Sequence, residues 1–108
     1  YYANYLKFIE RARSEWVRDL GIDQAQMKAE GLVFAVRRVV ADYLLPARYD
    51  DLLCVETKLL PGSGARLVLQ QDVKRGDATL FSATVTIICM TTDGAMTRLP
   101  AAIRQATR

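Results

Sequence analysis

The first segment of the chain has apolar side chains at helical spacing. They recur every three or four residues, at Tyr5, Phe8, Ile9, Ala12, Trp16 and Leu20. This period predicts an amphipathic helix with one apolar stripe. Asn4 is suited to the N-cap position, and Gly21 to the left-handed residue that ends such a helix. Asp23 is then expected to cap a short second helix that ends at Gly31, with Gln26 completing a capping box.

From Leu32 onward the period changes to that of β-strands. Residues 32–42 are rich in β-branched and aromatic side chains and predict a long, well-buried strand. Apolar and polar residues then alternate over residues 53–59 and 66–74, a long strand is expected at 79–91, a short one at 95–98, and a last helical turn at 101–105. In the long strand, Phe81, Ala83, Val85, Ile87 and Cys89 share one face.

The order of these elements predicts an α+β domain of two layers. Short turns between consecutive strands favour an antiparallel meander, and the long helix is the natural cover for one face of the sheet. Such a sheet leaves an edge to protect, so we expect the chain to dimerise through an edge strand.

Length, charge and hydropathy narrow the class of protein. The 108 residues predict a single domain over 1–108, and a hydrophobic content of 51% with a net charge of +3 argues against disorder. The basic residues are scattered rather than clustered, which does not favour a nucleic-acid partner. No apolar run approaches the roughly 18 residues of a membrane span.

The chain contains no histidine, which removes several kinds of chemistry. Ser-His-Asp and Cys-His nucleophile systems and His-ligated zinc are excluded, and we expect no metal site. Cys54 and Cys89 lie far apart in apolar runs and are interpreted as small core residues in a reducing, cytoplasmic compartment.

The start of the long helix is the candidate site. The sequence around Tyr2 and Ala3 is unusually aromatic for a helix entrance. Backbone N–H groups at a helix N-terminus carry partial positive charge and suit a thioester oxygen, a phosphate or a carboxylate. An oxyanion site at Tyr2 and Ala3 and simple aromatic packing at a chain end are equally compatible with the spacing.

Four blocks of the sequence resemble a known family. They are residues 2–16 (YANYLKFIERARSEW), 34–38 (FAVRR), 42–51 (DYLLPARYDD) and 98–100 (RLP). Together they resemble the acyl-CoA thioesterases of the hotdog fold, of the Tol-Pal-associated YbgC type, which are relatives of hydroxybenzoyl-CoA thioesterase. The resemblance covers essentially the whole chain.

The resemblance implies a fold and an assembly. The fold is an antiparallel sheet wrapped around one long central helix, and the assembly is a homodimer or homotetramer with active sites between subunits. In this family a carboxylate just before the helix entrance acts as nucleophile or general base. No such segment precedes Tyr1 here, so the resemblance implies an N-terminally incomplete hotdog domain whose first strand is missing.

The resemblance also implies roles for individual residues. Backbone N–H groups of Tyr2 and Ala3 would bind the oxyanion, Tyr5 would shape the pocket, and the acyl chain would run near Phe8 and Phe34. The phosphates of coenzyme A would meet basic side chains, with Arg37, Arg38 and Arg48 as candidates that structural ion pairs would explain equally well. The substrate would be an acyl-CoA or acyl-carrier-protein thioester, and no cofactor is expected beyond the coenzyme A of the substrate.

Two other functions stay open at this point. One is an acyl-thioester-binding hotdog domain without turnover, which a gene lacking the upstream aspartate would favour. The other is a structural domain linked to the cell-envelope Tol-Pal system, which only the resemblance suggests.

Overall fold

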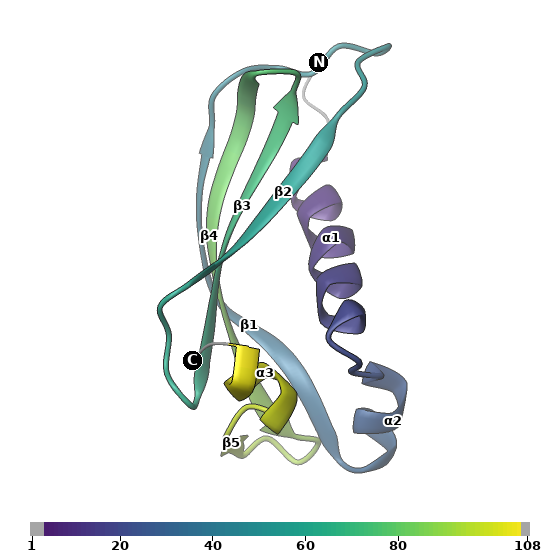
Figure 1. Cartoon of the computed structure of the whole chain (residues 1–108), viewed down its shortest axis with the longest axis vertical. Helices are drawn as coiled ribbons and strands as arrows, with labels where there is room; N and C mark the ends of the chain where they lie inside the picture. The colour runs from purple at the N-terminus through teal and green to yellow at the C-terminus, as the bar shows by residue number, and fades with distance from the viewer. Residues whose placement is uncertain (1–3, 107–108) are drawn as a thin grey trace.

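The computed structural model describes residues 4–106 as an elongated sheet with a long helix lying along one face (Figure 1). The elements in chain order are α1 (Tyr5–Asp19), α2 (Gln24–Ala29), β1 (Leu32–Tyr43), β2 (Cys54–Leu60), β3 (Arg66–Arg75), β4 (Ala78–Thr91), β5 (Met96–Thr97) and α3 (Ala101–Ala106). The predicted order of elements is confirmed, with bounds that differ from the expected ones by a few residues.

Local capping interactions explain where the two N-terminal helices begin and end. The side chain of Asn4 accepts a hydrogen bond from the Lys7 amide at 3.2 Å, which satisfies one free donor of the first turn of α1. Gly21 adopts φ +84°, a left-handed conformation that side chains with a Cβ rarely adopt. Asp23 caps α2 by accepting from two backbone amides. One half of the expected capping box is formed, because the Gln26 backbone amide donates to Asp23 Oδ1 at 3.2 Å, whereas the Gln26 side-chain amide donates to Glu30 at 3.5 Å.

The sheet is antiparallel, but it is not a simple meander. Its strands lie in the order β1-β4-β3-β2, with β5 paired to β4. Consecutive strands from β2 to β4 are neighbours as expected, whereas β1 pairs with β4. The connection over residues 44–53 reaches across the sheet, since ten extended residues can span up to about 33 Å and four strands occupy roughly 14 Å. A short turn would have placed β1 beside β2.

The core lies between α1 and the central strands. The side chains of β4 that were predicted to share a face are all buried: Phe81, Ala83, Val85, Ile87 and Cys89. From α1, Tyr5, Ile9 and Val17 are buried, whereas Phe8 of the predicted apolar stripe is 37% exposed. The helix packs on β2 and β3, so the stripe that it buries is narrower than its apolar pattern.

The prediction that the strand at 32–42 is well buried is wrong for its second half. Val36 is 49% exposed and Val39 is 40% exposed. Both pair with core residues of β4, Ile87 and Val85, so they point to the face of the sheet that α1 occupies. They are exposed because, among the described residues, β1 lies at one edge of the sheet, whereas α1 packs over β2 and β3 toward the opposite edge.

Candidate active site

The candidate oxyanion site lies at the beginning of α1. Tyr2 and Ala3 lie outside the described residues, so their predicted role stays a prediction. The described part of the entrance is the Asn4 cap, whose backbone carbonyl accepts from the Lys7 and Phe8 amides at 3.2 and 3.3 Å. The helix that follows is 15 residues long, and its dipole places partial positive charge at this end.

Tyr5 anchors the helix entrance to the sheet. Its side chain is 1% exposed, and its ring centroid lies 5.2 Å from that of Phe81 and 6.0 Å from that of Tyr43. Its hydroxyl donates a hydrogen bond of 2.8 Å to the carbonyl of Leu45. The structure therefore places Tyr5 in the core beneath the entrance, where it couples α1 to the connection after β1.

The Asp51 carboxylate stabilises the second half of the connection over residues 44–53. Asp51 Oδ2 accepts from the Arg48 amide at 2.6 Å and from Arg75 Nη1 at 2.7 Å, and its side chain is 11% exposed. The hydrogen bond from the Arg48 amide, and then that from Arg75, lower the pKa of the Asp51 carboxyl below its usual value. Arg48 thus forms this hydrogen bond through its backbone amide, and the charge of its guanidinium adds a smaller contribution to the lowered pKa of Asp51.

We expect Asp51→Asn to destabilise the protein at neutral pH and to cause a smaller loss of stability at acidic pH. A carboxyl whose pKa is lower in the folded state stabilises above its unfolded pKa, near 3.8, and that stabilisation is lost as pH falls through the folded value. Urea unfolding of both proteins from about pH 6 to about pH 3 should show their midpoints converging. Asp50→Asn, at the exposed neighbouring position, is the matched control. A midpoint difference that does not change with pH would contradict this role.

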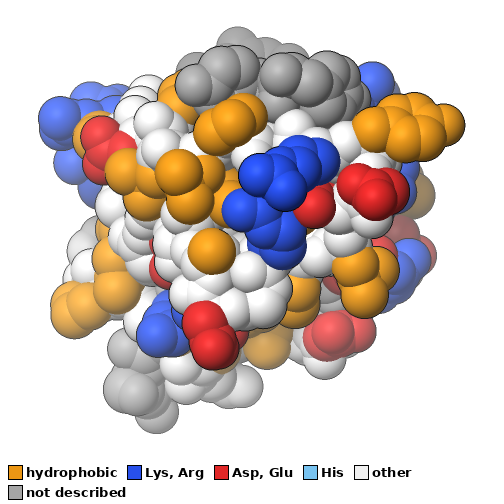
Figure 2. Space-filling view, turned by 90° about the horizontal axis from the view of Figure 1, so that it is seen from above, with side chains coloured by type: hydrophobic (Ala, Val, Ile, Leu, Met, Phe, Trp, Pro, Cys, Tyr) orange, Lys and Arg blue, Asp and Glu red, His pale blue; other side chains and the backbone are white. Residues whose placement is uncertain are grey.

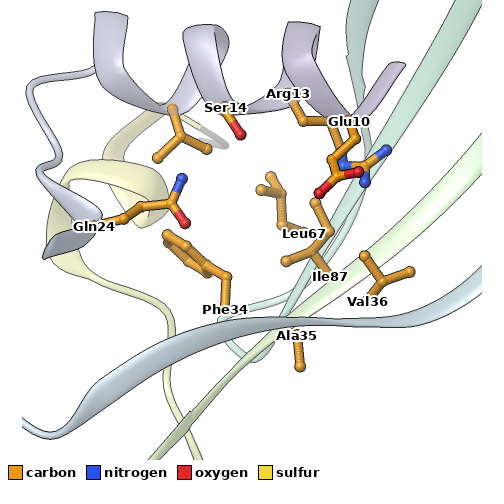
Figure 3. Close-up of a pocket in the computed structure, with 10 residues that line it drawn as sticks. Glu10, Arg13, Ser14, Gln24, Phe34, Ala35, Val36, Leu67 and Ile87 are labelled. Atoms are coloured by element: carbon orange, nitrogen blue, oxygen red, sulfur yellow. The ribbon is translucent and has the colours of Figure 1, made fainter. Parts of the chain in front are cut away.

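One recess lies between α1, α2 and the sheet, with a volume of about 160 Å³ (Figure 3). Its helical side carries polar groups and its sheet side is mostly apolar, with Phe34 near the Gln24 amide. The lining residues are Glu10, Arg13, Ser14, Val17, Gln24, Phe34, Ala35, Val36, Leu67 and Ile87.

A second recess lies between α1 and the segment that enters β2, with a volume of about 370 Å³. Phe8 lines it together with Arg11, Ala12, Glu15, Asp51, Leu53 and Val55. Phe8 and Phe34, which were expected beside one acyl chain, therefore line different recesses. Helical position explains this, because Phe8 is on the β2 side of α1 and Phe34 belongs to β1 at the opposite edge of the sheet.

Arginines gather at a third recess, of about 460 Å³, lined by Arg37, Arg38, Arg66 and Thr86. The register of β1 against β4 shifts between Val36 and Arg38, and such an irregularity redirects a side chain locally. Arg37 and Arg38 are thus brought together, whereas Arg48 is not part of this lining. Arg66 was not predicted as a site residue, because its proximity to Arg37 and Arg38 depends on β3 and β1 both flanking β4.

Comparison with known proteins decides the family. A family model described as the thioesterase superfamily matches residues 1–82. The chain belongs to the thioesterase superfamily. The resemblance seen in the sequence blocks is thereby confirmed.

Individual members of the superfamily match over most of the chain. The acyl-CoA thioesterase YbgC of Haemophilus influenzae is 38% identical over 91 residues, covering 83% of this chain and 67% of the relative. The acyl-CoA thioester hydrolase YbgC of Escherichia coli O157:H7 is 36% identical, covering 83% and 68%.

Solved structures agree with this membership. A probable thioesterase from Bartonella henselae matches with a TM-score of 0.84 and 36% identity, covering 93% of this chain and 84% of that one. A 1,4-dihydroxy-2-naphthoyl-CoA thioesterase from Synechocystis has a TM-score of 0.86 at 17% identity, covering 99% and 81%, and shows the fold alone. The expected hotdog arrangement of an antiparallel sheet wrapped around a long helix is confirmed.

Membrane-spanning helices and metal-binding side-chain groups were sought among the described residues of this thioesterase-superfamily chain. Over residues 4–106, none of the helices has the length and apolar character needed to cross a membrane. The same residues bring together no group of three His, Cys, Asp or Glu side chains that could hold a metal ion.

Proposed function

We propose that this protein is an acyl-CoA thioesterase, which hydrolyses the bond between an acyl group and the sulfur of coenzyme A. The observation that carries the proposal is the 38% identity to the YbgC acyl-CoA thioesterase of H. influenzae across 83% of the chain. In the reaction, water supplies the oxygen that joins the acyl carbon, the C–S bond breaks, and the sulfur leaves with a proton as free thiol.

The residues of the helix entrance would stabilise the charge that develops on the acyl oxygen. We assign this role to the backbone N–H groups of Tyr2 and Ala3, because these residues directly precede the Asn4 cap in the sequence and the α1 dipole places partial positive charge at that end of the helix. Because the sequence contains no histidine, an imidazole of this chain does not serve as general base. We propose that a carboxylate upstream of Tyr1 activates the water or attacks the acyl carbon.

The proposal is tested by thioester hydrolysis with the full-length gene product. A panel of short, long and aromatic acyl-CoAs is supplied, and free thiol is followed with a chromogenic disulfide. Saturable thiol release from at least one member is expected. Coenzyme A binding without thiol release from any member would contradict hydrolysis and favour a binding domain.

We further propose that the arginine recess binds phosphate groups of coenzyme A. Arg37, Arg38 and Arg66 surround it with guanidinium groups, and the Thr86 hydroxyl adds a donor. Guanidinium forks match phosphate oxygens and form strong charge-assisted hydrogen bonds with them. A recess of about 460 Å³ can take a single phosphate group with its neighbouring atoms. Arg48 does not line this recess, so its contact with the phosphates of coenzyme A stays a prediction.

We expect Arg66→Ala to raise KM for acyl-CoA about tenfold and to leave kcat nearly unchanged, because the phosphate contact is the same in ground and transition states. Removing the 3′-phosphate from the substrate should reproduce part of this rise in wild type and have little effect in the variant. Steady-state kinetics with acyl-CoA and acyl-dephospho-CoA measure both effects. Arg18→Ala, on the exposed side of α1, is the control. Equal discrimination between the substrates in wild type and Arg66→Ala would refute the assignment.

The exposed face of β1 supports the proposal that a second copy of the chain completes the molecule. Val36, Val39 and Tyr43 are 49%, 40% and 53% exposed, although all three pair with core residues of β4. Within the described residues, β1 is an edge strand, so one row of its backbone groups has no strand partner. A homodimer that joins the two β1 edges would pair these groups and cover the apolar face.

The end of the molecule at which α1 begins has apolar side chains interspersed with charged ones (Figure 2). The connection after β1 contributes Leu44, Leu45, Tyr49 and Leu52, which are 53%, 42%, 99% and 89% exposed. These residues follow β1 in the chain, and the Leu45 carbonyl accepts a hydrogen bond from the hydroxyl of Tyr5, the first residue of α1. A partner copy on β1 would thus lie close to the beginning of α1 at Tyr5.

We expect Val39→Glu to convert a dimer to a monomer, because it places a charge on the apolar face of β1. Met96→Glu, at an apolar position that is 51% exposed on β5, is the matched control and should leave the assembly intact. Light scattering coupled to size-exclusion chromatography gives the mass of each and also distinguishes a dimer from a tetramer. An unchanged mass for Val39→Glu would contradict an interface on this face.

The cellular location of the reaction is also a proposal. Cys54 and Cys89 are both free thiols. Cys89 is buried, as expected of a core residue, whereas the interpretation of Cys54 as a core residue is wrong, because it is exposed at the beginning of β2. An exposed free cysteine is typical of a reducing compartment, so we place the enzyme in the cytoplasm.

A further inference from the structure

Gln71 of β3 is a buried polar side chain that lies beneath α1. It is 0% exposed, and in residues 4–106 it stands alone as a buried polar or charged side chain. Its Nε2 donates to the Ile9 carbonyl on α1 at 2.9 Å and to Thr57 Oγ1 on β2 at 3.1 Å. The amide therefore ties the helix to two strands at one point.

The oxygen of the Gln71 side-chain amide accepts a hydrogen bond from Arg13. Gln71 Oε1 accepts from Arg13 Nη1 at 3.0 Å, although the two residues are 58 positions apart. The Arg13 guanidinium is part-buried, and burial lowers its pKa from the usual value while the nearby Glu10 carboxylate opposes this effect. Burying part of a guanidinium costs free energy, and a hydrogen bond to a neutral amide offsets only part of that cost.

The Arg13 side chain lines the recess between α1, α2 and the sheet, together with Glu10 one helical turn earlier (Figure 3). Neither residue belongs to the ion pairs within 4.0 Å that residues 4–106 form. The opposite wall is apolar, formed by Phe34, Leu67 and Ile87. The recess thus combines an apolar wall with adjacent groups that can donate and accept hydrogen bonds.

We propose that this recess binds the acyl chain and that Arg13, positioned by Gln71, makes the enzyme prefer acyl groups that carry a neutral oxygen such as a hydroxyl. This inference rests on the proposed function. A hydroxyl can accept from Arg13 and donate to Glu10. A carboxylate would be attracted by Arg13 but repelled by Glu10, and it would lose its hydration on entering the recess. An unsubstituted alkyl chain would cover Arg13 without supplying a hydrogen bond.

The position of the two side chains sets where the hydroxyl must lie. Glu10 follows the Asn4 cap by six residues, which is about 9 Å along a helix, and the longer Arg13 side chain leans back toward the same end. An extended chain advances about 1.2 Å per atom, so the hydroxyl should lie about seven atoms from the thioester carbon. Val36 belongs both to the recess lining and to the exposed β1 face, so a second copy would close the recess.

The test compares three straight acyl-CoAs of about seven carbons. One is unsubstituted, one has a terminal hydroxyl and one has a terminal carboxylate. For the full-length wild-type enzyme, we expect kcat/KM to be about tenfold higher for the hydroxyl substrate than for the unsubstituted one, and lowest for the carboxylate. Arg13→Met should bring the ratio of hydroxyl to unsubstituted substrate close to one.

Further variants separate selectivity from folding. Gln71→Leu, which keeps a buried side chain but removes the acceptor for Arg13, should lower the same ratio. If Gln71→Leu does not fold, the ratio measured for Arg13→Met decides the test, because position 13 is only partly buried. Arg18→Met, on the exposed side of α1, should keep the wild-type ratio. Equal kcat/KM for the two substrates in wild type, or a ratio that Arg13→Met leaves unchanged, would overturn the inference. Failure to hydrolyse any acyl-CoA would instead contradict the proposed function.

Discussion

Replacing Ala3 with proline is expected to lower kcat for acyl-CoA hydrolysis about 100- to 1000-fold. Proline has no backbone N–H, so the substitution deletes a proposed oxyanion donor. Position 3 precedes the Asn4 cap, so the hydrogen bonds of the first turn of α1, which involve Asn4, Lys7 and Phe8, are not removed. The loss should appear in kcat rather than KM, because charge on the acyl oxygen develops only in the transition state.

Two companion variants identify the group responsible. Tyr2→Phe should retain most activity if the backbone rather than the phenol hydroxyl acts at that position. Asn4→Ala removes the side-chain cap and should cost about 1 kcal/mol of stability with a smaller effect on kcat. Circular dichroism and urea unfolding show whether Ala3→Pro is folded. A folded Ala3→Pro with normal kcat would rule out a backbone donor at Ala3.

Phe81→Ala should reduce the free energy of unfolding by about 3–5 kcal/mol. Phe81 is 0% exposed, and its ring centroid lies 5.2 Å from Tyr5 and 4.9 Å from Tyr43. Removing the ring leaves a cavity beneath the helix entrance and weakens two aromatic contacts. A domain of this size has about 5–15 kcal/mol in total, so the loss is a large part of its stability. Urea unfolding followed by circular dichroism measures it.

Phe8→Ala is the matched control, because it removes the same ring from the same region at a position that is 37% exposed. Its cost should be clearly smaller, as less apolar area is lost from burial. Tyr5→Phe removes the hydrogen bond to the Leu45 carbonyl and should cost about 1 kcal/mol. Similar destabilisation by Phe81→Ala and Phe8→Ala would contradict the assignment of Phe81 to the core.

Local features of the fold were predictable because they depend on neighbours in the sequence. Asn4 and Asp23 cap helices through amides two or three residues away. The alternation in β4 identified its buried face, since a strand presents every second side chain to the core. The sequence blocks also identified the thioesterase family.

Features of the site that depend on distant strands were not predictable in the same way. Gln71 appeared only as one residue of an alternating strand, and its contacts join it to Ile9, Arg13 and Thr57. Arg66 joins Arg37 and Arg38 because β3 and β1 lie on either side of β4. The alternation of apolar and polar residues within one strand does not show which other strands will lie beside it in the sheet.

Local patterns along the chain thus predicted the kinds of element, their order, the caps of the two N-terminal helices and the family. Long-range packing places β1 at an edge of the described sheet, separates Phe8 and Phe34 into different recesses, and brings Arg13 into hydrogen-bond contact with Gln71. The physical reason is the range of the interactions. Helix caps and side-chain periodicity act over a few residues, whereas strand order and the contents of a recess follow from the long connection over residues 44–53 and the packing of α1 on β2 and β3.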